Sequence, residues 1–194
     1  MRTIYKNIPN FLSGFRLIAA PILLVIARQD RPILFLATLA ASLMTDAIDG
    51  FMARRFKVAS KAGARLDSWA DFLIFSVIAI SAWWLWPEIL EREIFFVITA
   101  IISFLLPVFA GVIKFKQLPC YHTWGAKVQA VLMCAAIYIL FITDVAWPFR
   151  YAVILQFFVA LEEILITLCL KKQRCNVPSL WHLMRSVSWQ SAVK

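Results

Sequence analysis

The sequence predicts an all-α integral membrane protein with six transmembrane helices, and three observations support this fold class. Hydrophobic residues make up 62% of the 194 residues and charged residues only 16%, which is far from the balance of a soluble domain. Apolar stretches of about 20 residues, the length that crosses a bilayer, recur along the chain. Prolines and short charged segments separate these stretches, as expected where helices end.

Each expected element follows from one of these stretches. The six spans are predicted at about 11–27, 33–55, 62–86, 94–113, 124–143 and 150–170. The N-terminal segment lacks the apolar core and cleavage site of a signal peptide, so we expect the first span to be retained. A length of 194 residues favours a single domain over 1–194, with its core at about 7–170. The basic, amphipathic tail over 171–194 is expected to lie on the membrane surface.

The distribution of Lys and Arg predicts the orientation of the spans. Basic residues gather at the N-terminus, in the second and fourth connections and in the tail, whereas the other connections are acidic or poor in basic residues. By the positive-inside rule, both termini and the facing ends of the second and third spans lie in the cytoplasm. We therefore expect a multi-pass protein of the plasma membrane, and the length without a targeting segment favours a bacterial inner membrane.

Charge and cysteine content exclude two other classes of function. The net charge is +9, but the basic residues flank apolar runs and form no single stripe, so we expect no nucleic-acid binding. The four cysteines show no CxxC spacing, which argues against a disulfide framework or a zinc site.

Four aspartates lie in apolar stretches of the second and third spans: Asp46, Asp49, Asp67 and Asp71. Within each pair the spacing is three or four residues, so both carboxylates share one helix face. A short connection makes the two spans an antiparallel hairpin, whose facing walls bring all four carboxylates together. Carboxylates are costly in a membrane, and a divalent cation is the partner that compensates several at once. Hard oxygen ligands favour Mg²⁺ or Mn²⁺.

Small residues and one arginine accompany the aspartates. Gly50, Ala53 and Gly63 lie on the same faces and either let a ligand approach the backbone or let the helices pack closely. Arg54 lies eight residues after Asp46 at the basic end of the second span. It either neutralises a carboxylate or binds a phosphate with its guanidinium fork.

The whole pattern, DxxDGxxAR followed by eight residues and GxxxDxxxD, resembles the signature of the CDP-alcohol phosphatidyltransferases at every defined position. The N-terminal run from Asn7 to Arg16, with Pro21 beyond it, is similar to the opening of the phosphatidylglycerophosphate synthase and cardiolipin synthase branches. The resemblance covers about residues 7–170, and the six predicted spans agree with it.

The resemblance implies a reaction and a role for each residue of the pattern. A phosphatidyl group would pass from CDP-diacylglycerol to an alcohol acceptor, with release of CMP. The four aspartates would bind two Mg²⁺ or Mn²⁺ ions, and Asp71 would also be the general base. Gly50, Ala53, Arg54 and Gly63 would line the nucleotide and diphosphate site. The family also implies a homodimer.

Glycerol 3-phosphate is the acceptor that the N-terminal motif and Lys127 favour, and it would give phosphatidylglycerophosphate. We expect Lys127, Arg65 and His122 to bind this acceptor. Two alternatives stay open for them: Lys127 reaching to the membrane interface and His122 as an interfacial hydrogen-bonding residue. Ser68 and Phe72 follow the last two aspartates where that branch commonly has Pro and Lys. Inositol phosphate, phosphatidylglycerol or another alcohol therefore remains an alternative acceptor.

Two rival functions also use aspartates in a membrane, and one feature of the last span is an anomaly. An intramembrane prenyltransferase carries two well-separated aspartate motifs, whereas here all four aspartates lie within 26 residues and Asp144 lies alone on the opposite side. A cation carrier needs polar residues along the outer halves of the second and third spans, which are apolar. The anomaly is Glu162 next to Glu163 in the last span, for which we favour an ion pair with Arg16.

Overall fold

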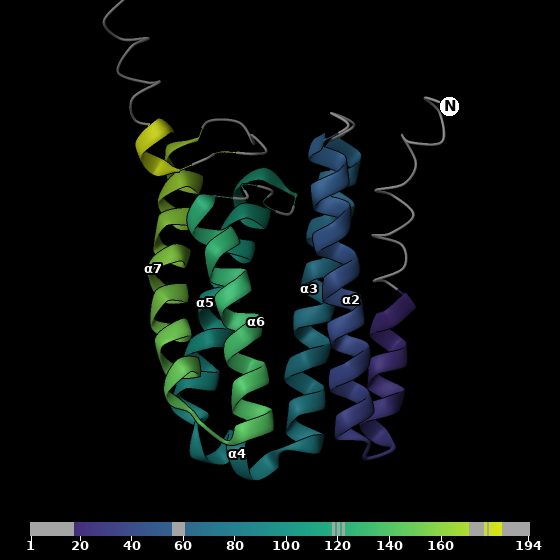
Figure 1. Cartoon of the computed structure of the whole chain (residues 1–194). Helices are drawn as coiled ribbons and strands as arrows, with labels where there is room; N and C mark the ends of the chain where they lie inside the picture. The colour runs from purple at the N-terminus through teal and green to yellow at the C-terminus, as the bar shows by residue number, and fades with distance from the viewer. Residues whose placement is uncertain are drawn as a thin grey trace, which may run out of the picture. The chain divides into compact units, whose positions relative to one another are not determined.

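A computed structural model describes residues 18–55, 61–117, 119, 121, 123–170, 177 and 179–183. For 46–55, 61–68 and 71 it describes the helical backbone alone. Within these ranges every regular element is a helix (Figure 1). The helices are Ile18–Arg28, α2 (Pro32–Arg55), α3 (Lys61–Leu85), α4 (Pro87–Arg92), α5 (Ile94–Phe115), α6 (Trp124–Thr143) and α7 (Trp147–Cys169).

Helices occupy the described parts of the six predicted spans, of which the first is described only from residue 18, and α4 is an additional short helix that was not predicted. In the part of the chain that the structure describes, α5, α6 and α7 are long and apolar enough to cross a membrane. Shorter apolar helical segments occur at Ile18–Arg28, Pro32–Thr45 and Phe72–Leu85. The six-span topology and its orientation stay predictions.

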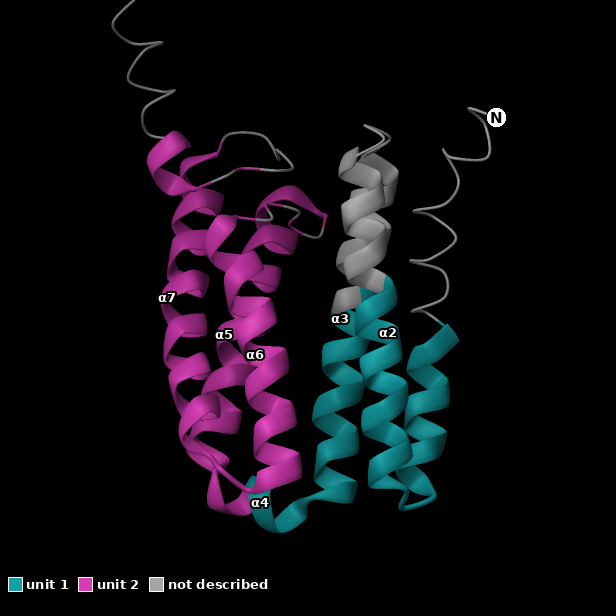
Figure 2. Ribbon diagram, in the orientation of Figure 1, with its two compact units in different colours: residues 1–90 teal, residues 91–194 magenta. Residues whose placement is uncertain are grey.

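The chain divides into two compact units, residues 1–90 and 91–194, coloured separately in Figure 2. Unit 1 holds the first described helix, α2 and α3. Unit 2 holds α5, α6, α7 and a short helical turn at 180–183.

Unit 1 contains an antiparallel hairpin of α2 and α3. Near the start of α2 the ring of Phe35 lies 6.1 Å from that of Trp86, which directly follows α3. The guanidinium of Arg28 lies 4.9 Å from the Trp84 ring and joins the end of the first helix to the same region. At the opposite ends of the hairpin only residues 56–60 connect Arg55 with Lys61, and so short a connection spans at most about 20 Å.

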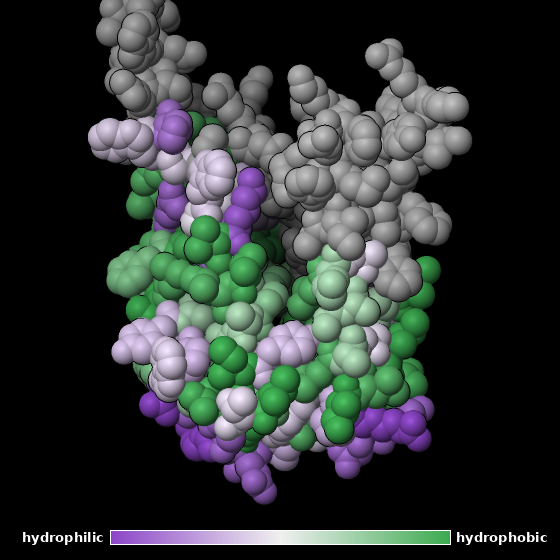
Figure 3. Space-filling model, in the orientation of Figure 1, coloured by the Kyte–Doolittle hydropathy of each residue, from purple (hydrophilic) through white to green (hydrophobic). Residues whose placement is uncertain are grey.

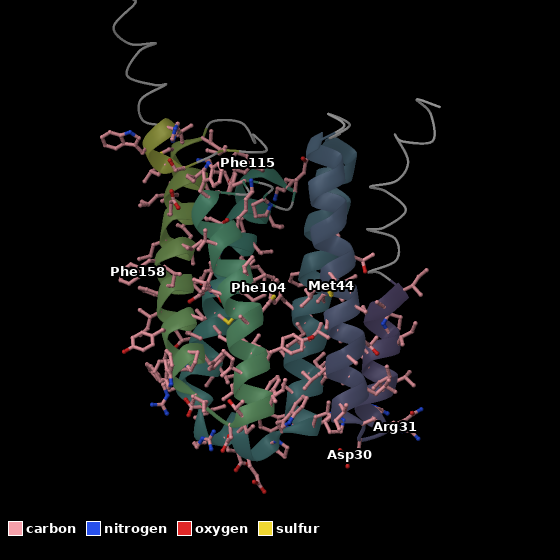
Figure 4. The ribbon with its side chains drawn as sticks, in the orientation of Figure 1. Asp30, Arg31, Met44, Phe104, Phe115 and Phe158 are labelled. Carbon is pink, nitrogen blue, oxygen red and sulfur yellow. The ribbon has the colours of Figure 1, made fainter. Side chains whose placement is uncertain are left out.

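The turn between the first helix and α2 needs a left-handed residue. Asp30 has φ 54°, a conformation that Asp adopts more readily than most side chains. Its backbone N–H donates to the carbonyl of Ala27 at 3.1 Å, which closes the helix end. Asp30 and Arg31 therefore lie at the tip of this turn (Figure 4).

Unit 2 is built around α7, which packs against both α5 and α6. Amide side chains join the three helices: Gln129 Nε2 donates to the carbonyl of Ala152 at 2.9 Å, and Gln156 Nε2 donates to the carbonyl of Ala100 at 2.9 Å. Inside a membrane such hydrogen bonds hold helices at a fixed rotation, because no water competes for the donors. Outward-facing positions are apolar, as Phe158 on α7 illustrates at 61% exposed (Figure 4).

Two bidentate ion pairs close one end of unit 2, which we call the Glu93 end. Arg150 at the start of α7 donates to both oxygens of Glu93 at 2.7 and 2.8 Å, and Glu93 is 1% exposed. Arg92 donates to both oxygens of Asp144, which directly follows α6, at 2.6 and 3.0 Å. Asp144 is thus paired with Arg92. On the face shown in Figure 3, hydrophilic residues gather near α4 and hydrophobic residues cover the middle of α6 and α7.

Candidate functional site

The backbone register of α2 places two aspartates on the continuation of its buried face. The buried residues of the described part of α2 are Phe35, Leu39 and Ser42, which recur at the three- and four-residue spacing of one helix face. Asp46 and Asp49 continue this spacing toward the end of the helix. Ser42, one turn before Asp46, is 1% exposed and its hydroxyl has no hydrogen-bond partner, so polar groups begin on this face before the aspartates.

The register of α3 places the other two aspartates in the same way. The buried residues of its described part are Ala70, Ile74, Val77, Ile78, Ser81 and Ala82. Asp67 precedes Ala70 by three residues and Asp71 precedes Ile74 by three, so both share the helical register of this stripe. The antiparallel hairpin brings the two stripes to the same end of unit 1. The structure thus describes the helical backbone that carries all four aspartates, whereas the positions of the four carboxylates lie outside the described side chains.

The donor set at this end of the hairpin fits a divalent cation. Four carboxylates at one end of two antiparallel helices would supply the oxygen ligands that Mg²⁺ and Mn²⁺ prefer. Gly50, Ala53 and Arg54 lie in the last turns of α2, and Gly63 and Arg65 lie in the first turns of α3. Their side chains also lie outside the described part. Among the side chains that are described, no group of three or more His, Cys, Asp or Glu is arranged to hold a metal ion.

Lys127 is the one predicted acceptor-binding residue whose side chain is described. It lies in the first turn of α6, is exposed, and places its Nζ 5.5 Å from the centroid of the Trp124 ring. An ammonium over an aromatic face is held in position while its charge stays available to an anion. His122 lies outside the described residues.

The polypeptide before α6 is anchored at what we call the Thr123 end of unit 2, which comprises the end of α5, the start of α6 and the end of α7. Thr123 is fully buried and caps α6, because its hydroxyl accepts from the N–H of Ala126 at 3.1 Å. The Tyr121 hydroxyl lies 2.8 Å from Thr167 Oγ1. Because Thr167 Oγ1 donates to the carbonyl of Glu163, Tyr121 is the donor of this pair. Burial raises the pKa of the Tyr121 phenol, which keeps that donor protonated.

One further contact joins α5 to α7, and another places α5 against the loop that leads to α6. Lys114 Nζ donates to the carbonyl of Leu168 at 2.8 Å. A Cβ atom added to Gly111 would lie 2.9 Å from Pro119 Cδ, so a side chain at this position would displace the loop. These contacts were not predicted from the sequence. A Thr directly before an apolar helix was the available signal for the Thr123 cap.

Glu162 is bound by a backbone amide of the C-terminal segment. Its Oε1 accepts from the N–H of Leu180 at 3.0 Å. The expected partner, Arg16, lies outside the described residues, so that ion pair stays a prediction. Part of the tail is folded onto unit 2, because Val177 and Leu183 are buried in one cluster with Tyr121, Ile166 and Leu170.

Comparison with known proteins identifies the family to which the chain belongs. Residues 6–169 match the CDP-alcohol phosphatidyltransferase family. A CDP-diacylglycerol--glycerol-3-phosphate 3-phosphatidyltransferase of Salmonella choleraesuis (strain SC-B67) is 30% identical over 166 residues, covering 79% of this chain and 86% of that protein. A probable phosphatidylglycerophosphate synthase of Mycobacterium tuberculosis is 25% identical over 174 residues, covering 83% of this chain and 78% of its own. No solved structure matches the chain significantly. Because the family match extends across both aspartate-bearing helices and α5 to α7, the chain belongs to the CDP-alcohol phosphatidyltransferase family and is a transferase of phospholipid biosynthesis.

Proposed function

We propose that this enzyme transfers the phosphatidyl group of CDP-diacylglycerol to glycerol 3-phosphate and releases CMP. The observation that carries the proposal is the register of four aspartates on the continuation of the buried faces of α2 and α3. The printed name of the Salmonella relative, which is similar over most of both chains, favours glycerol 3-phosphate as the acceptor.

In the proposed site Asp46, Asp49, Asp67 and Asp71 hold two Mg²⁺ or Mn²⁺ ions, which when bound neutralise the diphosphate of the donor. Gly50, Ala53 and Gly63 leave room for the nucleotide and diphosphate close to the helix backbones. Arg54 donates its guanidinium fork to phosphate oxygens.

Asp71 acts in this proposal as the general base. It accepts the proton of the acceptor hydroxyl while the oxygen forms a bond to the phosphorus that carries the diacylglycerol. The bond from that phosphorus to the bridging oxygen breaks, and CMP departs with the electron pair. No covalent enzyme intermediate is required, so the residues contribute mainly positioning and neutralisation of charge.

Lys127, Arg65 and His122 are the proposed ligands of the acceptor phosphate. Lys127 supports this assignment because its exposed ammonium is held beside Trp124 at the first turn of α6. Inositol phosphate, phosphatidylglycerol or another alcohol is the alternative acceptor, which stays open because Ser68 and Phe72 depart from the pattern of that branch. We further propose that the site faces the cytoplasm of a bacterial inner membrane and that the enzyme is a homodimer. Family membership argues against the prenyltransferase and the cation carrier.

The test is CMP release by the purified protein with CDP-diacylglycerol and Mg²⁺ or Mn²⁺. Glycerol 3-phosphate, inositol, inositol phosphate, serine and phosphatidylglycerol are supplied separately. We expect release with glycerol 3-phosphate alone. Release with a different member of the panel would keep the reaction class and replace the acceptor, and silence with all five would contradict the proposed acceptor range.

A further inference from the structure

The geometry of unit 2 points to Glu162 as a positioning residue that links the C-terminal turn at 180–183 to the first turn of α6, and thereby sets the place of Lys127 for the acceptor. This inference rests on the proposed function, since it assigns Lys127 to the acceptor. It gives the tail a role in the reaction.

Glu162 lies against the first turn of α6. A Cβ atom added to Gly125 would lie 3.4 Å from Glu162 Oε2 and 3.4 Å from Val159 Cγ2. The backbone of α6 therefore lies directly against α7 two residues before Lys127. A change in the position of the Glu162 carboxylate or of this part of α7 therefore displaces the first turn of α6, because close-packed helices transmit strain.

Glu162 also contacts the C-terminal tail. One carboxylate oxygen faces Gly125, and the other accepts the backbone N–H of Leu180 at 3.0 Å. Leu180 is the first residue of the helical turn, where its N–H has no partner within the helix. The Ser179 hydroxyl lies 2.9 Å from His182 Nδ1 and shapes the same turn.

An apolar cluster holds the helical turn at 180–183 in place. Val177 and Leu183 are 6% and 7% exposed and pack with Tyr121, Ile166 and Leu170. Phe115, which Figure 4 labels at the end of α5, and Leu180 pack against this cluster. The tail is thus attached on both sides of its hydrogen bond to Glu162, and Tyr121 carries the same attachment into the segment that leads to the Thr123 cap.

Two matched pairs of variants test the inference. Glu162→Leu removes the acceptor oxygen, whereas Glu162→Gln keeps an oxygen that accepts the Leu180 N–H. Leu180→Pro removes the N–H at the first helical position, where proline is tolerated, and Leu180→Ala keeps the N–H but shortens the side chain. The KM for the acceptor, the KM for CDP-diacylglycerol and kcat are measured for each variant.

We expect Glu162→Leu and Leu180→Pro to raise the KM for the acceptor on the order of tenfold, because a small displacement of a binding group is enough for such a loss. Glu162→Gln and Leu180→Ala are expected to stay within about twofold of the wild type, and the KM for CDP-diacylglycerol to stay unchanged in all four. The double variant Glu162→Leu/Leu180→Pro should have the same acceptor KM as either single variant, since both substitutions remove the same hydrogen bond.

Three results would overturn the inference while leaving the proposed function intact: an unchanged acceptor KM in Glu162→Leu and Leu180→Pro, equal effects of the two members of each pair, or a loss confined to kcat. A wild-type protein that turns over no acceptor would instead contradict the proposed function, and this inference with it.

Discussion

At the scale of single residues, the proposed chemistry distinguishes Asp71, which also accepts a proton, from the other three aspartates, which only bind metal. Asp71→Asn keeps the size and polarity of the side chain but cannot accept the acceptor proton. We expect turnover to fall by at least about 100-fold, the lower range for loss of a general base, while CDP-diacylglycerol binding is partly retained. CMP release and donor binding measured on the same preparation check this prediction, and full activity would exclude Asp71 as the base.

The proposed metal ligands make a different prediction. Asp46→Asn or Asp67→Asn removes one charged ligand, so we expect a higher Mn²⁺ concentration for half-maximal activity together with weaker donor binding. Asp30→Asn is a matched control, because Asp30 lies at the exposed turn before α2. A Mn²⁺ titration of Asp46→Asn and Asp67→Asn that coincides with the control would argue against both ligands.

At the scale of elements, the ion pairs at the Glu93 end hold α4, α5, α6 and α7 together. The Arg150 guanidinium donates to Glu93 and lowers the pKa of that carboxyl, and Arg92 lowers the pKa of Asp144 in the same way. A carboxyl whose pKa is lower in the folded state contributes stability that is present above its unfolded pKa. This contribution is lost as the pH falls through the folded pKa.

Thermal unfolding in detergent from pH 7 to pH 3 tests this pairing. Since Asp and Glu in unfolded chains titrate at about pH 4, we expect the free energy of unfolding of the wild type to fall as the pH is lowered from about 5. Glu93→Gln should lower the stability at pH 7 by about 1–2 kcal/mol, a modest value because Arg150 keeps access to water. The variant should also lose less on acidification, and a pH dependence identical to that of the wild type would contradict the role of Glu93.

Apolar stretches predicted the long helices, but not the short helix α4 or the contacts at the helix ends. The length of the apolar stretches located the long helices because the thickness of a bilayer sets the length of a span, and prolines marked the connections between them. The pairing of Arg92 with Asp144 joins residues 52 positions apart, and the bond from Leu180 to Glu162 joins a backbone group to a side chain 18 positions away. No sequence pattern specifies such partners. The roles of the four aspartates stay predictions, since their helical register alone is described.

At the scale of the whole molecule, the protein is a transferase by its family match. Its two units contain the residues for different parts of the proposed reaction. Unit 1 bears the aspartates, and unit 2 bears Lys127 with the tail that we infer to position it. Donor chemistry and acceptor affinity should therefore respond to separate sets of substitutions. This separation is why the variants of Glu162 and Leu180 are expected to leave the KM for CDP-diacylglycerol unchanged.

The most direct measurement of the central claim follows radiolabelled glycerol 3-phosphate into lipid. Purified protein is incubated with CDP-diacylglycerol and Mg²⁺ or Mn²⁺, with and without EDTA, and the organic and aqueous phases are counted beside the CMP released. We predict that label enters the organic phase in equal amounts with CMP and that EDTA stops both until metal is restored. Label that stays in the aqueous phase while CMP is released with another alcohol, or transfer that persists in EDTA, would contradict the account.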